Sequence, residues 1–225
     1  MAIYNKENVK KYDGLYESGH DHDYPNLDLV RLAAKYFIDK NTNLLDFGFG
    51  SGENLFHFHR KNFKVYGIEA SIKAIELVEK KIKQKDIKDN KIKLKKINEN
   101  DKKIPFEDNF FDNIICTSVI SILKSKENIL ELIQEFHRIL KKNGKLIIDI
   151  NGPKSSFQKE GKFISEDIYE TNIKSGGKIK VYCPQNKKVF SNLFQDFHVD
   201  ELGEVKFNYF NFSEHEYIAC VRKKN

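Results

Sequence analysis

Residues 44–54 read LLDFGFGSGEN, and the glycines at every second position, Gly48, Gly50 and Gly52, constrain the fold more than any other feature of the chain. Alternating glycine continues a β-strand poorly, because a residue without a side chain adds no packing and loses much backbone entropy on folding. A strand over residues 42–47 that ends in such a loop is typical of an open α/β sheet. Sheets of this kind bind ligands at the carboxyl ends of their strands.

Strand and helix patterns alternate from this loop to residue 150. Apolar runs predict strands over residues 63–70, 91–97, 111–119 and 145–150. Amphipathic spacing predicts helices over residues 26–37, 51–60, 71–82 and 127–140, the last closed by a left-handed cap at Asn143-Gly144. This alternation implies βαβ crossovers and a parallel sheet. The pattern then weakens, and we expect a long loop over 151–184, a helix over 186–197 and two strands over 204–223.

The composition fits one folded unit whose positive charge is a solvated surface. A chain of 225 residues is long enough for one well-buried core. The net charge of +6 comes almost wholly from lysine, whereas arginine makes the bidentate contacts that nucleic-acid recognition favours. Three widely spaced cysteines predict neither a disulfide framework nor a zinc site. Without a signal-peptide core or a membrane-length apolar run, we expect a cytoplasmic protein with no membrane or DNA partner.

The residues after the glycines exclude two common nucleotide-binding loops. A Walker-type phosphate loop ends in Gly-Lys-Ser/Thr, but Gly52 is followed by Glu53-Asn54. The dinucleotide pattern GxGxxG, counted from Gly48, requires glycine where this chain has Glu53. A carboxylate there would repel a pyrophosphate at the helix N-terminus. The loop therefore suits a ligand that has no phosphate at this point.

S-adenosylmethionine is such a ligand, since it carries a sulfonium cation, an ammonium group and a carboxylate. Asp46 before the loop and Glu53 within it suit a cationic ligand. Glu69 ends the second predicted strand, where an acid can accept hydrogen bonds from both hydroxyls of a ribose. The glycine loop followed by this acid is a more specific pattern than either feature alone.

Four stretches, LLDFGFGSGEN, VYGIEAS, KKIPFEDNFFDNIICTSVI and EFHRILKKNGKLIIDI, together resemble the class I S-adenosylmethionine-dependent methyltransferases. The resemblance covers residues 43–150. It implies a Rossmann-like fold, with a seven-stranded, mostly parallel sheet, one antiparallel strand and helices on both faces. It also implies S-adenosylmethionine as the cofactor and S-adenosylhomocysteine as its product. The expected cofactor-binding residues are Asp46, Gly48, Gly50, Gly52, Asn54, Glu69, Ala70, Asn100, Asp101, Thr117 and Ser118.

Two departures from the family pattern affect this prediction. The adenine-contacting acid of the family falls on Asn100 here, with Asp101 beside it, so either side chain is a candidate for that contact. The end of the strand over 111–119 lacks the proline-containing motif with which nucleic-acid amino-methyltransferases of this fold grip the target amine. Methylation of DNA bases is therefore not expected.

The stretch GHDHDYPN, residues 19–26, supplies the first candidates for catalysis. His20 and His22 precede the first predicted core helix, where this fold usually places a cap over the cofactor, and His215 lies near the turn of the last two strands. Each is a candidate general base for a hydroxyl nucleophile, although a polar surface turn is the favoured interpretation of residues 19–26 and a core or surface role that of His215. The two His-Asp pairs have poor metal-ligand spacing, so no metal site is predicted.

Five tyrosines are the candidate substrate contacts. They are Tyr16, Tyr24, Tyr169, Tyr182 and Tyr209. The first two belong to a helical cap over residues 1–40, which precedes a cofactor-binding core over 41–150. The others belong to residues 151–225, expected to form a substrate lid and the C-terminal strands of the same domain.

The resemblance extends to small methyltransferases encoded among surface-polysaccharide genes. It favours O-methylation of a sugar or of a nucleotide-activated precursor by a monomer or homodimer, which is an analogy at the level of the fold. Three alternatives remain open: an N-methyltransferase, an RNA methyltransferase supported only by the basic charge, and a non-catalytic partner protein that binds the cofactor.

Overall fold

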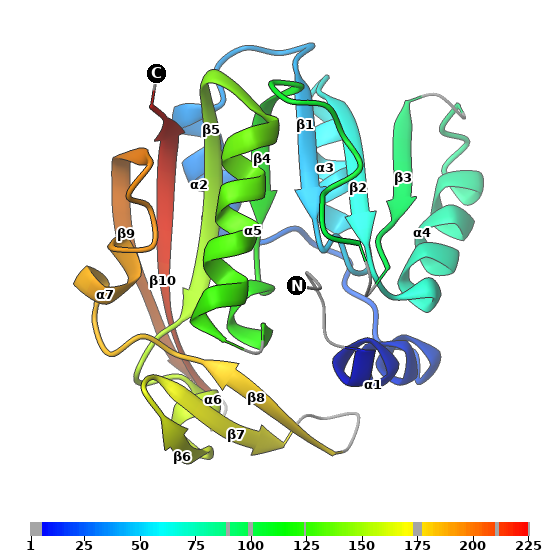
Figure 1. The fold of residues 1–225 in the computed structure, drawn as a ribbon. Helices are drawn as coiled ribbons and strands as arrows, with labels where there is room; N and C mark the ends of the chain where they lie inside the picture. Colours follow the sequence, from blue (N-terminus) through cyan, green and yellow to red (C-terminus); the bar gives the residue numbers. More distant parts are fainter. Residues whose placement is uncertain are drawn as a thin grey trace.

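The computed structural model describes residues 6–88, 91–98, 101–123, 125–172, 177–209 and 212–224. A seven-stranded sheet forms its centre, in the order β3-β2-β1-β4-β5-β10-β9 (Figure 1). The strands are β1 (Asn43–Phe47), β2 (Lys64–Glu69), β3 (Ile92–Lys96), β4 (Phe111–Cys116), β5 (Leu140–Asn151), β9 (Phe197–Tyr209) and β10 (Phe212–Lys223). Neighbouring strands from β3 to β5 run parallel, and β10 is antiparallel to both β5 and β9. The predicted sheet with one antiparallel strand is confirmed.

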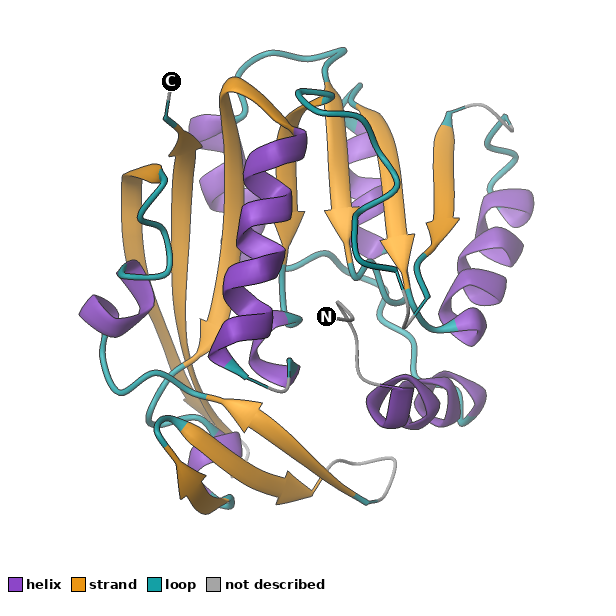
Figure 2. Ribbon diagram, viewed as in Figure 1, coloured by secondary structure: helices purple, strands orange, loops and turns teal. Residues whose placement is uncertain are grey.

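Helices cover both faces of this sheet (Figure 2). One face packs against α2 (Leu27–Tyr36), α3 (Glu53–Arg60) and α4 (Ile72–Gln84), and the other against α5 (Lys126–Ile139) and α7 (Lys187–Ser191). In α5 the buried residues are apolar and recur at helical spacing: Ile129, Leu132, Ile133, Phe136 and Ile139. Burying such a stripe against the sheet stabilises the helix more than its intrinsic propensity does.

Side-chain caps fix where the helices begin. The side chain of Asn26 accepts hydrogen bonds from the backbone N–H groups of Asp28 and Leu29, and Ser71 Oγ accepts one from Ala74. Each cap satisfies N–H groups that the first helical turn leaves without partners. Because β1 and β2 end next to these starts, the carboxyl edge of the sheet is lined by helix N-termini.

The end of α5 differs from the predicted one. The helix stops at Ile139, and Leu140 is already extended and paired with Phe111 in β4. Asn143 has a left-handed φ of 60° but lies within β5, so the prediction that Asn143-Gly144 caps the helix was wrong. Strand pairing ended the helix before the glycine did.

Residues 151–184 were expected to be a loop, but they contain a second sheet. It is three-stranded and antiparallel, with β6 (Lys162–Ser165), β7 (Ile168–Asn172) and β8 (Lys178–Tyr182), and a short helix α6 (Ser156–Lys159) precedes it. This small sheet and the N-terminal helix α1 (Lys6–Glu17) both lie beyond the carboxyl ends of the parallel strands (Figure 1). Together they border the edge at which ligands bind in such folds.

The C-terminal elements also differ in length from the prediction. The helix α7 is shorter than expected and β9 begins at Phe197, so the last two strands form a longer antiparallel pair. Among the described helices, none combines the length and apolarity needed to cross a lipid bilayer.

Candidate active site

A cavity of about 380 Å³ lies between the carboxyl ends of β1, β2 and β4 and the helix α1. Its wall contains the glycine loop, the segment after β4, and one side of the N-terminal region. The described lining residues are Asn8, Val9, Tyr12, Tyr16, His20, His22, Tyr24, Asn26, Gly48, Phe49, Gly50, Ser51, Glu53, Asn54, Glu69, Ala70, Ser71, Thr117, Ser118, Val119, Ile122 and Leu123. The cavity therefore brings together most of the cofactor residues that the sequence predicts.

The glycine loop has the backbone conformation that only glycine adopts easily. The φ angles are +75° at Gly48, +53° at Gly50 and +88° at Gly52. A Cβ on Gly48 would lie 2.4 Å from Val119 Cγ2, and one on Gly50 would lie 2.7 Å from the Tyr16 hydroxyl. The first two glycines thus form cavity wall, while Gly52 is the N-cap of α3.

Glu69, the last residue of β2, supports this loop through hydrogen bonds to its side chain. Its carboxylate accepts hydrogen bonds from the backbone N–H groups of Gly50 (3.0 Å), Ala70 (2.7 Å) and Ser71 (3.0 Å). Burial raises the pKa of Glu69, and the three backbone hydrogen bonds partly offset that rise. The side chain lines the cavity, and the further lone pairs of its oxygens can accept hydroxyl groups of a ligand.

Asp46 lies under the loop as a buried acid. The residue is 1% exposed, and its Oδ2 atom has no hydrogen-bond partner among the described residues. Burial, with a smaller contribution from the Glu69 charge, raises the pKa of Asp46 to about 8. Asp46 is not itself one of the residues that line the cavity. A buried acid with one unpartnered oxygen next to the cavity favours a cationic ligand, because a nearby positive charge stabilises the carboxylate.

The raised pKa of Asp46 predicts a distinct pH dependence of stability. The folded state keeps a proton on Asp46 that the unfolded chain loses near its ordinary value of 3.8, so stability falls as pH rises toward about 8. We expect Asp46→Asn to remove this loss, so that its stability advantage over the wild type grows between pH 5 and 8 by about 1 kcal/mol per pH unit. Urea unfolding at several pH values measures it. Asp39→Asn, an exposed control, should track the wild type, and parallel curves for Asp46→Asn would contradict the assignment.

The N-terminal segment contributes a chain of aromatic rings to the wall. Ring centroids are 5.8 Å apart for Tyr16 and His20, 4.6 Å for His20 and His22, and 5.8 Å for His22 and Tyr24. All four residues line the cavity, and Tyr24 is 65% exposed, which places it at the rim. Both predicted N-terminal histidines and both N-terminal tyrosines are thus next to the predicted cofactor loop.

Sequence reasoning missed the first half of this wall. Asn8 and Tyr12 line the cavity from α1, and they precede Tyr16 at intervals of four residues, which places all three on one side of a helix. That spacing was the available signal. The helix is fixed at both sides of the cavity, since Asn8 Nδ2 donates to the carbonyl of Ile122 (2.8 Å) and Ser71 Oγ donates to Asp13 (2.5 Å).

Three further predicted residues connect the wall to the sheet. Asn54 Nδ2 donates to Thr117 Oγ1 (3.4 Å), and Asn54 Oδ1 accepts a hydrogen bond from the backbone N–H of Asn26 (3.0 Å). Ser118 has a left-handed φ of 58°, and its backbone N–H donates to the buried Asp149 carboxylate (2.6 Å). These bonds set the shape of the segment that follows β4.

His215 was predicted as a catalytic candidate, and the structure corrects this. The residue is 1% exposed and is not among the lining residues. Its Nδ1 accepts a hydrogen bond from the backbone N–H of Lys154 (3.0 Å), so the proton lies on Nε2, 2.7 Å from Glu204 Oε1. With both nitrogens engaged and no access to the cavity, His215 cannot take a proton from a substrate.

The predicted contacts from the C-terminal half also fall outside the cavity wall. Tyr182 is 2% exposed within the main core, and the Tyr169 hydroxyl accepts hydrogen bonds from Gln158 (2.7 Å) and Gln185 (3.0 Å). Asp101, which was predicted to contact the cofactor, is not among the lining residues either. Its carboxylate accepts a hydrogen bond from the backbone N–H of Asn98 (2.7 Å) in a turn. Asn100 and the side chain of Tyr209 lie outside the described residues.

Comparison with known proteins agrees with this geometry. Residues 45–148 match a protein family described as a methyltransferase domain. An uncharacterized protein from Methanocaldococcus jannaschii is 28% identical over 169 residues, which are 68% of this chain and 66% of that protein. The match therefore spans slightly less than two thirds of this relative.

Two solved structures share the fold. One is a SAM-dependent methyltransferase from Methanosarcina mazei, with a TM-score of 0.71 at 18% identity, covering 91% of this chain and 99% of that one. The other is the [4+2]-cyclase SpnF, with a TM-score of 0.72 at 15% identity, covering 100% and 97% of the two chains. At these identities the likeness shows the fold alone.

The family match, the sheet and the acids at its carboxyl edge define one class of protein. Residues 45–148 match a methyltransferase domain, and the fold is that of the class I S-adenosylmethionine-dependent methyltransferases. The residues present fit this cofactor, because the unpartnered Asp46 oxygen suits its positive charge and the glycine loop leaves room that a Cβ would fill.

Proposed function

We propose that the protein transfers the methyl group of S-adenosylmethionine to a hydroxyl oxygen of a small polar molecule such as a sugar. The observation that carries the proposal is that His20 and His22 line the cavity. A hydroxyl nucleophile loses its proton as the new bond forms, and histidine is a suitable acceptor of that proton. The other polar lining residues are mostly tyrosine, asparagine, serine and threonine, whose groups suit hydrogen bonding to a polyhydroxylated molecule.

The charge of the wall narrows the acceptor further. None of the described lining residues is lysine or arginine, whereas Glu53 and Glu69 are both present. Phosphate groups are bound by cationic side chains or by exposed helix N-termini. An uncharged sugar therefore fits this wall better than a nucleotide-activated precursor, whose phosphates would have to remain outside the cavity.

When bound, S-adenosylmethionine supplies an electrophilic methyl group on a sulfonium. The chain then has three tasks: to hold the cofactor, to orient the acceptor and to take a proton. Glu69 and the glycine loop would hold the ribose, and Asp46 would balance positive charge once the cation of the cofactor favours its ionised form. His20 or His22 would accept the proton of the acceptor hydroxyl.

Tyr12 and Tyr16 act in this scheme as hydrogen-bond donors. Burial and the neighbouring charge of Glu69 raise the pKa of Tyr12 to about 12 and that of Tyr16 further. Both hydroxyls therefore keep their protons at neutral pH and can orient acceptor oxygens from α1. Because α1 covers one side of the cavity, the same helix limits the access of water to the cavity.

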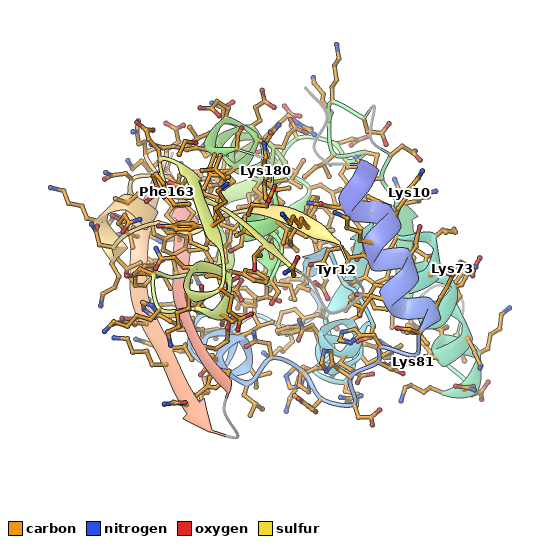
Figure 3. All side chains as sticks on the ribbon, turned by 90° about the horizontal axis from the view of Figure 1, so that it is seen from below. Lys10, Tyr12, Lys73, Lys81, Phe163 and Lys180 are labelled. Carbon is orange, nitrogen blue, oxygen red and sulfur yellow. The ribbon has the colours of Figure 1, made fainter. Side chains whose placement is uncertain are left out.

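The proposal also assigns roles to the parts of the chain. Residues 1–40 form the cap, 41–150 the cofactor core, and 151–225 the acceptor side together with the C-terminal strands. In support, Lys11 Nζ donates a hydrogen bond to the carbonyl of Lys178, which joins α1 to β8. In the view from below, α1 runs beside β8 and Tyr12 is labelled between them (Figure 3).

The decisive experiment measures turnover with a panel of acceptors. Purified protein is incubated with S-adenosylmethionine and sugars, nucleotide sugars or amines, and S-adenosylhomocysteine is quantified by mass spectrometry. With a hydroxyl acceptor, we expect the His20→Asn/His22→Asn variant to lose about 100-fold or more in kcat, because it lacks the base. Its affinity for S-adenosylhomocysteine should stay within about twofold, since that ligand needs no base. His198→Asn, whose side chain is 62% exposed on β9, is the control.

Two results would redirect the proposal. An amine acceptor that the histidine variant methylates at the wild-type rate would indicate N-methylation, which needs less help from a base. Tight S-adenosylhomocysteine binding without turnover on any acceptor would favour a non-catalytic, cofactor-binding partner protein.

A further inference from the structure

Lys81 of α4 contacts three separate parts of the site although it lies outside the cavity lining. Its ammonium group donates to Glu53 Oε1 (2.9 Å), to the carbonyl of Ser51 (3.1 Å) and to the carboxylate of Asp21. Ser51 belongs to the glycine loop, Glu53 begins α3, and Asp21 belongs to the segment between α1 and α2. One side chain thus connects loop, helix and cap.

The Lys81–Glu53 pair is shielded from solvent more than an ordinary surface ion pair, whereas the Asp21 side chain of the second pair is 35% exposed. The Lys81 side chain is 11% exposed and that of Glu53 is 10% exposed, so solvent screens their pairing little. Burial opposes the charged form, but the ion pairs with Asp21 and Glu53 raise the pKa of Lys81 overall. The lysine therefore remains charged across the physiological range. In the view from below, Lys81 lies near the C-terminal end of α1 (Figure 3).

The cap is fixed to the core on both sides of the Asp21 contact. Before it, Ser71 Oγ and the backbone N–H of Lys73 donate to Asp13 (2.5 and 3.2 Å). After it, the backbone N–H of Asn26 donates to Asn54 Oδ1 (3.0 Å). Residues 18–25 between these anchors form no helix or strand, yet they carry His20, His22 and Tyr24 of the cavity wall.

We propose that Lys81 is a positioning residue, which ties the cap segment 18–25 to the glycine loop and so holds the cofactor in its cavity. The link acts through Asp21 on the cap side and through Ser51 and Glu53 on the loop side. When it is broken, the segment moves away from the loop more often and the cofactor leaves faster. The inference requires cofactor binding but is independent of the acceptor, so it stands or falls separately from O-methylation.

The test compares two neutralising substitutions in the same segment. Asp21→Asn removes the ion pair with Lys81, and Asp23→Asn is the matched control, with the same charge change two residues away. We expect Asp21→Asn to raise the Kd for S-adenosylhomocysteine about tenfold through a faster dissociation rate, with an unfolding midpoint close to the wild type. Stopped-flow displacement and calorimetry provide the rate and the affinity. Equal dissociation rates for the two variants would overturn the proposal.

A second pair of variants separates positioning from the effect of an unpaired buried charge. Lys81→Met alone leaves Glu53 unpaired, whereas Lys81→Met/Glu53→Gln removes both charges and should recover most of the stability. If Lys81 holds the cap, the double variant still releases S-adenosylhomocysteine about tenfold faster, and adding Asp21→Asn changes nothing further. Wild-type release in the double variant, or full additivity with Asp21→Asn, would show that Lys81 is only structural.

Discussion

Glu69→Ala should weaken the binding of S-adenosylhomocysteine by about 100-fold or more, because it removes both the ligand contact and the support of the loop. The carboxylate engages the backbone of Gly50 and the start of α4 at once. Its loss leaves these N–H groups without acceptors and deprives the ribose of its expected partner. Isothermal titration calorimetry at neutral pH measures the change.

Two further variants make this result specific. Glu76→Ala removes an acid from the exposed side of α4, where its side chain is 56% exposed, and should leave the affinity unchanged. Glu69→Gln keeps the shape and one acceptor oxygen, so we expect an intermediate loss. An unchanged Kd for a well-folded Glu69→Ala protein would mean that the cavity binds its cofactor in some other way.

Gly48→Ala should destabilise the protein by about 3 kcal/mol. The left-handed backbone costs a non-glycine residue about 1–2 kcal/mol, and forcing a Cβ into packed surroundings adds about 1–3 kcal/mol. Here the added atom would lie 2.4 Å from Val119 Cγ2. Urea unfolding measures the free energy of unfolding of the variant against the wild type.

The clash can be separated from the backbone strain by a second substitution. In the Gly48→Ala background, Val119→Ala removes the opposing atom and should recover about 1–2 kcal/mol, leaving the left-handed penalty. Gly14→Ala is the control, since Gly14 lies within α1 with no atom within 4 Å of an added Cβ, and alanine there should be stabilising. If Gly48→Ala changed the free energy of unfolding as Gly14→Ala does, the loop would not be packed closely against Val119.

The parts of the site that sequence predicted are those set by local backbone geometry. Gly48 and Gly50 had to be glycine because of their φ angles, and Glu69 had to end a strand to reach the loop. Each requirement acts over a few residues and leaves a visible pattern in the chain. The parallel order of the strands followed from the same local alternation of strand and helix.

The errors came from contacts that depend on tertiary packing. His215 lies on an antiparallel strand, and only the pairing of β10 with β9 and its contact with Lys154 decide that its ring is sealed from the cavity. The β6–β8 sheet was missed because no helix separates its strands. It therefore lacks the alternation of strand and helix patterns that identified β1 and β3, which are equally short.

The N-terminal part of the cavity wall has a consequence for how such a protein changes specificity. Its lining residues all lie within residues 8–26, one uninterrupted stretch that adds no strand to either sheet. Acceptor preference can therefore diverge in evolution, or be redesigned, by exchanging this stretch as a cassette while the core keeps its sequence. The exchange needs to preserve only a few attachment points, among them Asp13, Asp21 and the backbone of Asn26.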